Sequence, residues 1–250
     1  MSDAPDIRPI LALLEDANDA GRCMEAAAAL RVLSQLRPEN LQVKAALTRA
    51  LFGAGLWQEA WDAYEVRFDL MPEVFTKVTR PGPNGPEAMP IWRGGALPDA
   101  LLVMGEQGLG DTIQFARYAL LAAAAGAKVA FSVQDPLLRL FKDFASDVTV
   151  IGQNEEPTEF DLHCPLLSLP LAHSTRLATI PAFEQGYLAA PTEDVARWDQ
   201  RLPKGRRRIG LVWSGSQTHA NDANRSVPLA KLVPLFQPGE VWVSLQKEVR

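Results

Sequence analysis

A repeat of 34 residues organises the first third of the chain and restricts it to copies of one small unit. Gly21 recurs as Gly55 at that offset, and Ala26 recurs as Ala60. The same offset joins three further identical pairs, Leu13 with Leu47, Glu25 with Glu59 and Pro38 with Pro72. Periods of about 20–50 residues are typical of solenoids, whose units bury their apolar faces against one another. We therefore predict tandem helix pairs in this region.

The repeated residue types suit two helices joined by a tight turn. We expect helices at 41–53 and 57–69 with Gly55 in the turn, because a positive φ is cheap only for glycine. Ala60 lets the two helices approach closely, and Pro72 ends the second one because proline cannot continue a helix. A pair of helical hairpins with accidental spacing is the alternative.

Residues 7–73 resemble tetratricopeptide repeats, a family with this same period. The resemblance implies a surface for a protein or peptide partner. Because about three repeats are usually needed for independent stability, we expect two repeats to pack on the following domain or on another chain.

The pattern changes after a proline- and glycine-rich segment at 80–90. Short apolar runs then alternate with stretches of helical spacing, which predicts a parallel sheet covered by helices. We expect strands at 100–104, 128–133, 148–151 and 160–163, and helices at 111–125, 136–144 and 166–171.

A second α/β unit is expected from residue 208 onward, with strands at 209–213 and 241–245 after a helix at 193–201. Two strands are too few for a doubly wound domain, so we expect the chain to stop before that domain is complete. The predicted fold is therefore α-helical repeats (1–79), a linker (80–99), a Rossmann-like parallel α/β domain (100–190) and the incomplete start of a second α/β domain (191–250).

A glycine-rich segment, GEQGLGDT, follows the first predicted strand of the sheet. Ligands of open parallel sheets bind beyond the carboxyl ends of the strands. The spacing Gly-x-x-Gly-x-Gly matches neither the dinucleotide-binding fingerprint nor the P-loop, so nicotinamide and P-loop enzymes are disfavoured. Asp111 has two interpretations, an N-cap of the following helix or a general base at the cleft.

The run GEQGLGDTIQFARY, with LVWSGSQTHANDANRSVPL and VSLQK further on, resembles a bacterial group in which tetratricopeptide repeats precede a GT-B glycosyltransferase module. That module is similar to the lipopolysaccharide heptosyltransferases and, more distantly, to O-GlcNAc transferase. The resemblance implies transfer of a sugar from a nucleotide-diphosphate donor to a hydroxyl acceptor, with no metal or other cofactor. It implies that Asp111 is the base, and Gln107, Gly108 and Gly110 are the substrate-loop residues beside it.

A second candidate site follows the predicted strand at 209–213. Small residues and backbone N–H groups ahead of a helix, expected near residue 228, suit a diphosphate. The residues concerned are Ser214, Gly215, Ser216, Asn224 and Arg225, and the guanidinium of the last would pair with phosphate oxygens. An ordinary polar connection is the alternative.

Two further residues are candidates with weaker signals. Lys247 follows the next strand, where it would meet phosphate, although lysines after strands are common. His163 lies in FDLHCPLLSLP, a run that also resembles the family, and it either faces the cleft or has a structural role.

Composition narrows the remaining function classes. The net charge of −5 argues against nucleic-acid binding, and the polar, acidic N-terminus is unlike a signal peptide. No apolar run reaches the roughly 18 residues of a membrane span, so we expect a cytoplasmic protein. Three histidines and two cysteines show no metal-ligand spacing, and we expect neither a metal site nor a disulfide. A protein-interaction module with an inactive α/β domain is the alternative function.

Overall fold

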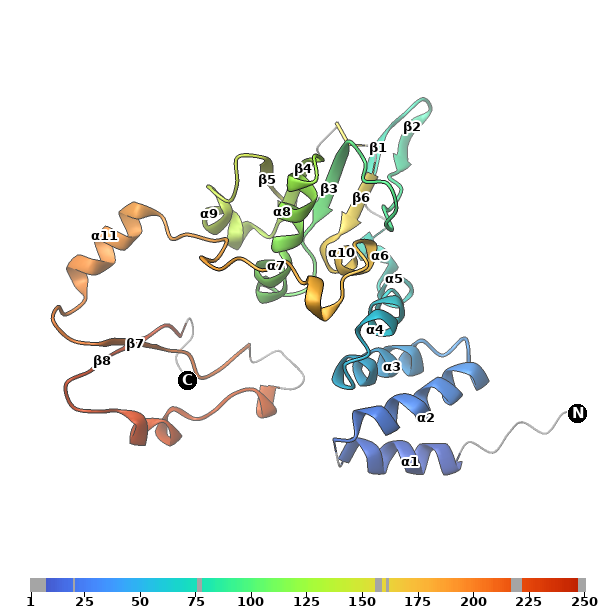
Figure 1. Ribbon diagram of the computed structural model, residues 1–250, viewed down its shortest axis with the longest axis horizontal. Coiled ribbons are helices and arrows are strands. Elements are labelled where there is room, and N and C mark those ends of the chain that lie inside the picture. Colours follow the sequence, from blue (N-terminus) through green and yellow to red (C-terminus); the bar gives the residue numbers. More distant parts are fainter. Residues whose placement is uncertain are drawn as a thin grey trace, which may run out of the picture. The chain divides into compact units, whose positions relative to one another are not determined.

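The computed structural model describes residues 8–19, 21–75, 78–155, 159–160, 162–216 and 222–246. Two compact units divide it, Met1–Ala189 and Ala190–Arg250. The first unit combines helices with a four-stranded parallel sheet, and the second contains a two-stranded parallel sheet (Figure 1). The mixed helical and parallel α/β class predicted from the sequence is confirmed.

Helix pairs open the first unit (Figure 1). The first pair is α1 (Arg8–Asp19) with α2 (Cys23–Leu36), and the second is α3 (Leu41–Gly53) with α4 (Trp57–Tyr64). The bounds of α3 are those predicted. Asn40 precedes α3 and caps it, because its side chain accepts the N–H groups of the second and third helical residues at 3.1 Å.

The turns inside the two pairs are equivalent in their backbone. Gly21 and Gly55 both adopt a left-handed conformation, with φ of 67° and 74°. The residue after each glycine donates its N–H to a carbonyl five residues earlier, Ala17 at 2.7 Å and Leu51 at 3.0 Å. This bond is the one that closes a helix in the Schellman motif. The 34-residue offset seen in the sequence is thus present in the geometry.

Small side chains lie where the helices meet. Ala26 and Ala60 are 2% and 0% exposed, and both belong to one apolar cluster with Leu30, Leu33 and Leu51. At the surface, Arg31 on α2 donates its Nε to Glu59 on α4 at 2.7 Å. The close approach predicted at Ala60 is therefore observed.

The second helix of the second pair is shorter than predicted. It breaks after Tyr64, and two short helices follow, α5 (Arg67–Leu70) and α6 (Pro72–Phe75). The N–H groups at the break bond three residues back instead of four, a tighter turn that marks a helix end. Pro72 begins α6, where its missing N–H is no loss, instead of directly terminating the longer helix.

The segment predicted as a linker contains a hairpin. Strands β1 (Thr79–Gly82) and β2 (Gly85–Ala88) pair antiparallel. Beyond them, Trp92 donates its N–H to the carbonyl of His163 at 2.8 Å, and its ring is buried in the main core. The linker is therefore tied to one edge of the sheet.

Four parallel strands form the sheet, in the order β5-β4-β3-β6. Their bounds are β3 (Ala100–Met104), β4 (Lys128–Val133), β5 (Val148–Gly152) and β6 (Leu162–Pro165). The first two agree with the prediction, the third is one residue longer, and the fourth is shifted by two residues. The connecting helices are α7 (Leu109–Phe115), α8 (Arg117–Ala124), α9 (Leu138–Phe141) and α10 (Leu169–Ala172).

Both faces of this sheet carry apolar side chains, as is usual for buried parallel strands. Leu101 and Val103 of β3 lie in the main core with Phe131 of β4, while Leu102 and Ala130 belong to a smaller cluster on the opposite face. The strand order places β6 beside β3 on the side away from β4. The carboxyl ends of β3 and β6 thus define the topological switch point, the usual place for a ligand in such sheets.

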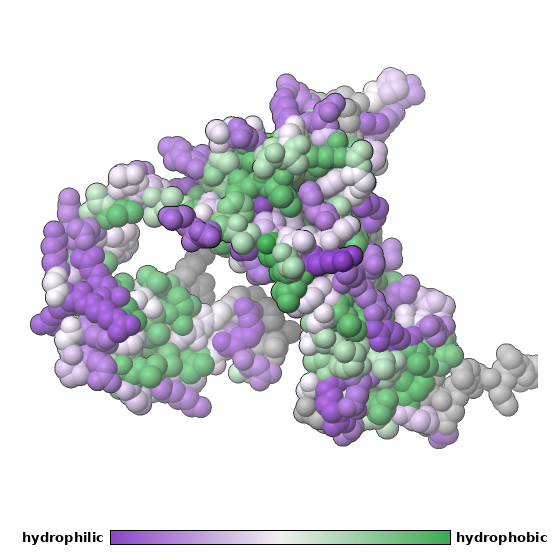
Figure 2. Space-filling view, viewed as in Figure 1, coloured by the Kyte–Doolittle hydropathy of each residue, from purple (hydrophilic) through white to green (hydrophobic). Residues whose placement is uncertain are grey.

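The second unit contains α11 (Thr192–Arg201), β7 (Arg208–Leu211) and β8 (Val241–Ser244). The helix expected near residue 228 is replaced by two short 3-10 turns, Leu229–Lys231 and Val233–Leu235, with Pro234 between the ends of the second. Among the described residues of this unit, only Trp213 is buried, at 8% exposed. Figure 2 shows apolar side chains at its surface beside strongly polar ones.

No helix within the described ranges combines the length and apolar character needed to cross a membrane.

We expect the second unit to drive self-association, because it leaves apolar side chains in water. Val212 and Leu245 are 61% and 62% exposed. Sedimentation velocity at micromolar concentration should show association that decreases in Val212→Ser/Leu245→Ser. Val74→Ser, at a site 44% exposed in the first unit, is the matched control. A clean monomer of the unmodified protein would contradict the prediction.

Candidate functional site

The loop after β3 lies at the switch point, and a hydrogen bond to the neighbouring strand β4 holds its first residue in place. Gly105 donates its N–H to the carbonyl of Ser132 at 2.7 Å, and a Cβ on Gly105 would lie 2.9 Å from that oxygen. A glycine is therefore required there. Gln107 follows with φ of 61°, the left-handed region that side chains rarely adopt. The loop thus has one fixed and unusual path toward Asp111.

Asp111 is the third residue of α7, not its N-cap as one interpretation held. Gly108 occupies the N-cap position, and its N–H donates to Oδ2 of Asp111 at 2.9 Å. This is half of a capping box, so the carboxylate stabilises the helix start from inside it. Asp111 is partly exposed, and a Cβ on Gly110 would meet nothing within 4 Å. The structure thus brings Gln107, Gly108, Gly110 and Asp111 together in one loop, with open space beside Gly110.

A buried ion pair, which the sequence analysis did not identify, connects this loop to the helix pairs. Nε and Nη2 of Arg67 donate to the two oxygens of Glu106, each at 2.9 Å. The residues are 3% and 6% exposed. Glu106 follows β3 by two residues, and Arg67 begins α5. The two-pronged geometry is the strong form of a charge-assisted hydrogen bond.

Further groups complete the network around Arg67. Its Nη1 donates to Glu65 at 2.6 Å, and its Nη2 also donates to the hydroxyl of Ser168 at 2.6 Å. Glu106 in turn accepts the N–H of Leu167 at 2.9 Å. Because Leu167 and Ser168 follow β6, a single guanidinium holds the loops after both strands of the switch point.

The guanidinium also lies over aromatic rings. The ring centroids of Tyr64 and Phe68 are 4.6 and 4.7 Å from its central carbon. Burial raises the pKa of Tyr64 to about 12; Arg67 opposes this, and the charges of Glu106, Asp111 and Glu65 add to it. The Tyr64 phenol is therefore neutral at physiological pH and lies within electrostatic reach of Asp111.

A pocket of about 440 Å³ borders this network within the first unit. We call it the aromatic pocket. Its walls are Phe52, Trp57, Trp61 and Tyr64 from the second helix pair, Gln114, Phe115, Arg117 and Tyr118 from α7 and α8, and Leu167, Thr175, Arg176, Leu177 and Ile180 after β6. Gln114 and Phe115 lie one helical turn beyond Asp111, on the same side of α7. The pocket therefore begins one helical turn along α7 from the candidate base, which is not itself one of its lining residues.

His163 does not support the role in a cleft that the sequence analysis allowed. It lies within β6 opposite Leu102 and is 1% exposed. Neither ring nitrogen has a hydrogen bond of normal geometry among the described residues. Burial lowers the pKa of His163, and the nearby backbone of Pro90 and Met89 offsets this only in part. Its surroundings are those of a buried structural side chain.

In the second unit, the loop after β7 brings Gly215 and Arg225 together. A Cβ on Gly215 would lie 3.6 Å from the guanidinium of Arg225. Backbone N–H groups expected to face a diphosphate already have partners. Ser214 donates its N–H to Oε1 of Gln246 at 3.1 Å, and Gly215 donates its N–H to Ser226 at 3.1 Å.

Three other residues were predicted to bind the donor diphosphate, and the structure does not treat them alike: it describes two and leaves out one. Ser216 and Asn224 lie on either side of the undescribed residues 217–221, and both have interactions within the protein. Lys247 lies outside the described residues. The missing α-helix near residue 228 removes one expected source of anion-binding N–H groups. Arg225 is thus the feature of this loop that best fits a phosphate.

No protein-family model, curated protein or solved structure matches the chain.

We expect Arg67→Met to cost about 3–5 kcal/mol of unfolding free energy, because it leaves the carboxylate of Glu106 buried without its partner. Arg31→Met removes the ion pair with Glu59, in which both side chains are substantially exposed, and should cost about 0–1 kcal/mol. Urea unfolding monitored by circular dichroism measures both. Equal losses would show that the buried pair has no special structural role.

We expect stability to fall as the pH drops from about 7 to about 5.5, since the unfolded chain then binds protons that buried histidines do not. The ordinary histidine pKa is 6.5, and burial lowers it at His163 and His173. His163→Leu should be neutral or stabilising at pH 7 and should flatten this loss, leaving the share due to His173. Urea titrations at each pH test this. An unchanged slope, or a strongly destabilised variant at pH 7, would contradict it.

Proposed function

We propose that this protein is a glycosyltransferase that moves a sugar from a nucleotide-diphosphate donor to a hydroxyl acceptor. The observation that carries the proposal is the position of Asp111. A partly exposed carboxylate lies in the first turn of a helix, at the switch point of a parallel sheet and one helical turn from the aromatic pocket. A general base needs an ionisable group within reach of a substrate hydroxyl.

In the proposed reaction, Asp111 takes the proton of the acceptor hydroxyl while that oxygen attacks the anomeric carbon of the donor. The bond from this carbon to the diphosphate breaks, and the nucleoside diphosphate leaves with the electron pair. Within the second unit, Arg225 is the candidate to bind the diphosphate of a donor. The N–H groups of Ser214 and Gly215 contribute only where the donor replaces their present partners, Gln246 and Ser226.

Within this proposal, the sheet of the first unit is the acceptor-side half of a GT-B fold. The second unit then belongs to the nucleotide-sugar-binding half, as the similarity of its motifs to that family suggests. The helix pairs are proposed to be tetratricopeptide repeats. Their equivalent turns and buried alanines support this assignment.

A second candidate function is protein interaction without catalysis. Apolar side chains are exposed on the first helix pair, namely Leu11 (46%), Leu13 (47%), Met24 (53%) and Val32 (44%). Such a surface suits a protein or peptide partner. Titration calorimetry with a panel of nucleotide-diphosphate sugars separates the two functions. Binding to one of them supports transfer, and binding to none favours the interaction module.

We expect Asp111→Asn to lower turnover by about 10²–10⁴-fold, because an amide cannot accept the proton. Its side-chain oxygen can still accept the N–H of Gly108, so the variant should fold. Donor affinity should be nearly unchanged, whereas Arg225→Gln should weaken it. Release of nucleoside diphosphate, thermal unfolding and donor calorimetry measure the three quantities. A fully active Asp111→Asn protein would reduce Asp111 to a helix cap.

A further inference from the structure

The aromatic pocket is larger than a packing defect. Voids inside well-packed proteins seldom exceed a water molecule, whereas this one has about 440 Å³. Ligand pockets usually measure about 300–1,000 Å³, and apolar and aromatic side chains form most of their walls. Six aromatic residues border this pocket, and one of them, Trp57, is 40% exposed. The walls therefore offer flat apolar surface to a ligand.

The aromatic rings are held in place by one another. Trp61 meets Phe52 and Phe115 edge to face, with centroids 4.8 and 5.7 Å apart. Phe115 in turn lies nearly parallel to Tyr118 at 6.1 Å. These contacts run from the second helix pair to α8, so the pocket walls are preorganised.

The charged side chains that line the aromatic pocket are all positive. Among the described residues that line it, the charged ones are Arg117 and Arg176, and none is a carboxylate. Arg117 donates to the carbonyl oxygens of Gln114 and Pro181, each at 3.0 Å, which orient it without neutralising its charge. Arg176 is exposed and forms no ion pair with a described residue. This local excess of positive charge lies in a protein whose net charge is −5.

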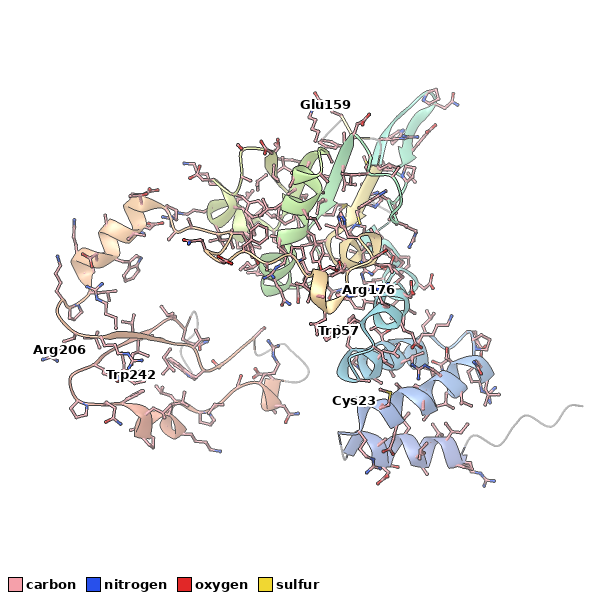
Figure 3. The ribbon with its side chains drawn as sticks, in the orientation of Figure 1. Cys23, Trp57, Glu159, Arg176, Arg206 and Trp242 are labelled. Atoms are coloured by element: carbon pink, nitrogen blue, oxygen red, sulfur yellow. The ribbon has the colours of Figure 1, made fainter. Side chains whose placement is uncertain are left out.

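Arg176 and Trp57 are both exposed and line the same pocket, and Figure 3 labels both. The side chain of Gln58 donates to the carbonyl of Thr175 and so ties α4 to the segment that carries Arg176. A flat ring against Trp57 would therefore have a cation within reach at its edge.

We propose that the aromatic pocket binds a small organic anion with a flat aromatic ring system. The ring lies against Trp57 and Trp61, and the anionic group, a carboxylate, sulfonate or phosphate, pairs with Arg176. The binding inferred here involves neither Asp111 nor the second unit, so its test can succeed or fail whether or not the proposed sugar transfer is correct.

A pair of dyes with the same ring skeleton tests the proposal. 1-Anilinonaphthalene-8-sulfonate carries an anionic group, and N-phenyl-1-naphthylamine lacks it. Fluorescence titration should show that the sulfonate binds the unmodified protein about tenfold more tightly, since a charge-assisted contact is worth roughly that factor. Arg176→Gln should strongly reduce this preference, leaving only the share due to Arg117. Arg206→Gln, at an exposed arginine of the second unit, is the matched control and should retain it.

Trp57→Ala should weaken the binding of both dyes, because it removes the apolar ring surface of the pocket and leaves the charge of Arg176 in place. Leu177→Ala, at a rim position that is 69% exposed, replaces it if the tryptophan variant unfolds. Only dye bound in the pocket should respond to these variants, so comparing the affinities of the variants distinguishes it from dye bound to other apolar surface. Equal affinity of the two dyes for the unmodified protein, or an unaltered preference in Arg176→Gln, would overturn the proposal. Dye binding that is unchanged in the Trp57 or Leu177 variant would do the same.

Discussion

The first unit depends on one buried guanidinium. Arg67 comes from the helix pairs, and the groups it binds come from the loops after β3 and β6. Without Arg67, the buried carboxylate of Glu106 would have no counter-charge, and this would cost several kcal/mol of folding free energy. A sheet of this kind usually keeps its switch point open for a ligand. Here the side chain of Arg67 lies between the loops after β3 and β6 and bonds to both.

This dependence explains why two helix pairs suffice. An array of two repeats has too little core to be stable alone. The second pair obtains further burial against the sheet, through Arg67 and through the rings from Phe52 to Tyr118. The number of repeats predicts such packing, but it does not identify the contact that provides it. The contact joins residues far apart in the chain, and no local spacing encodes it.

Much of the local structure was predictable, and two of the failures have a tertiary cause. Helix 41–53 and strands 100–104 and 128–133 agree with prediction because propensity, period and boundary signals coincide there. The predicted helix at 57–69 breaks where Arg67 turns toward Glu106, so a tertiary contact overrides the local pattern. At the candidate site, the glycine loop and Asp111 were identified from the sequence. The aromatic pocket was missed, because its walls come from three separate segments that only the fold brings together.

The two units use the same device at the carboxyl ends of paired parallel strands, with different consequences. In the first unit, Glu106 after β3 accepts the N–H of Leu167 after β6. In the second unit, Gln246 after β8 accepts the N–H groups of Trp213 and Ser214 after β7, and it also donates to the carbonyl of Ser214 at 3.0 Å. A side chain from one loop thus sets the shape of its neighbour in both cases. A neutral amide satisfies the second loop without a counter-charge, whereas a buried carboxylate requires one. The candidate acceptor loop therefore depends on the helix pairs for its shape, and the candidate donor loop obtains its shape within its own unit.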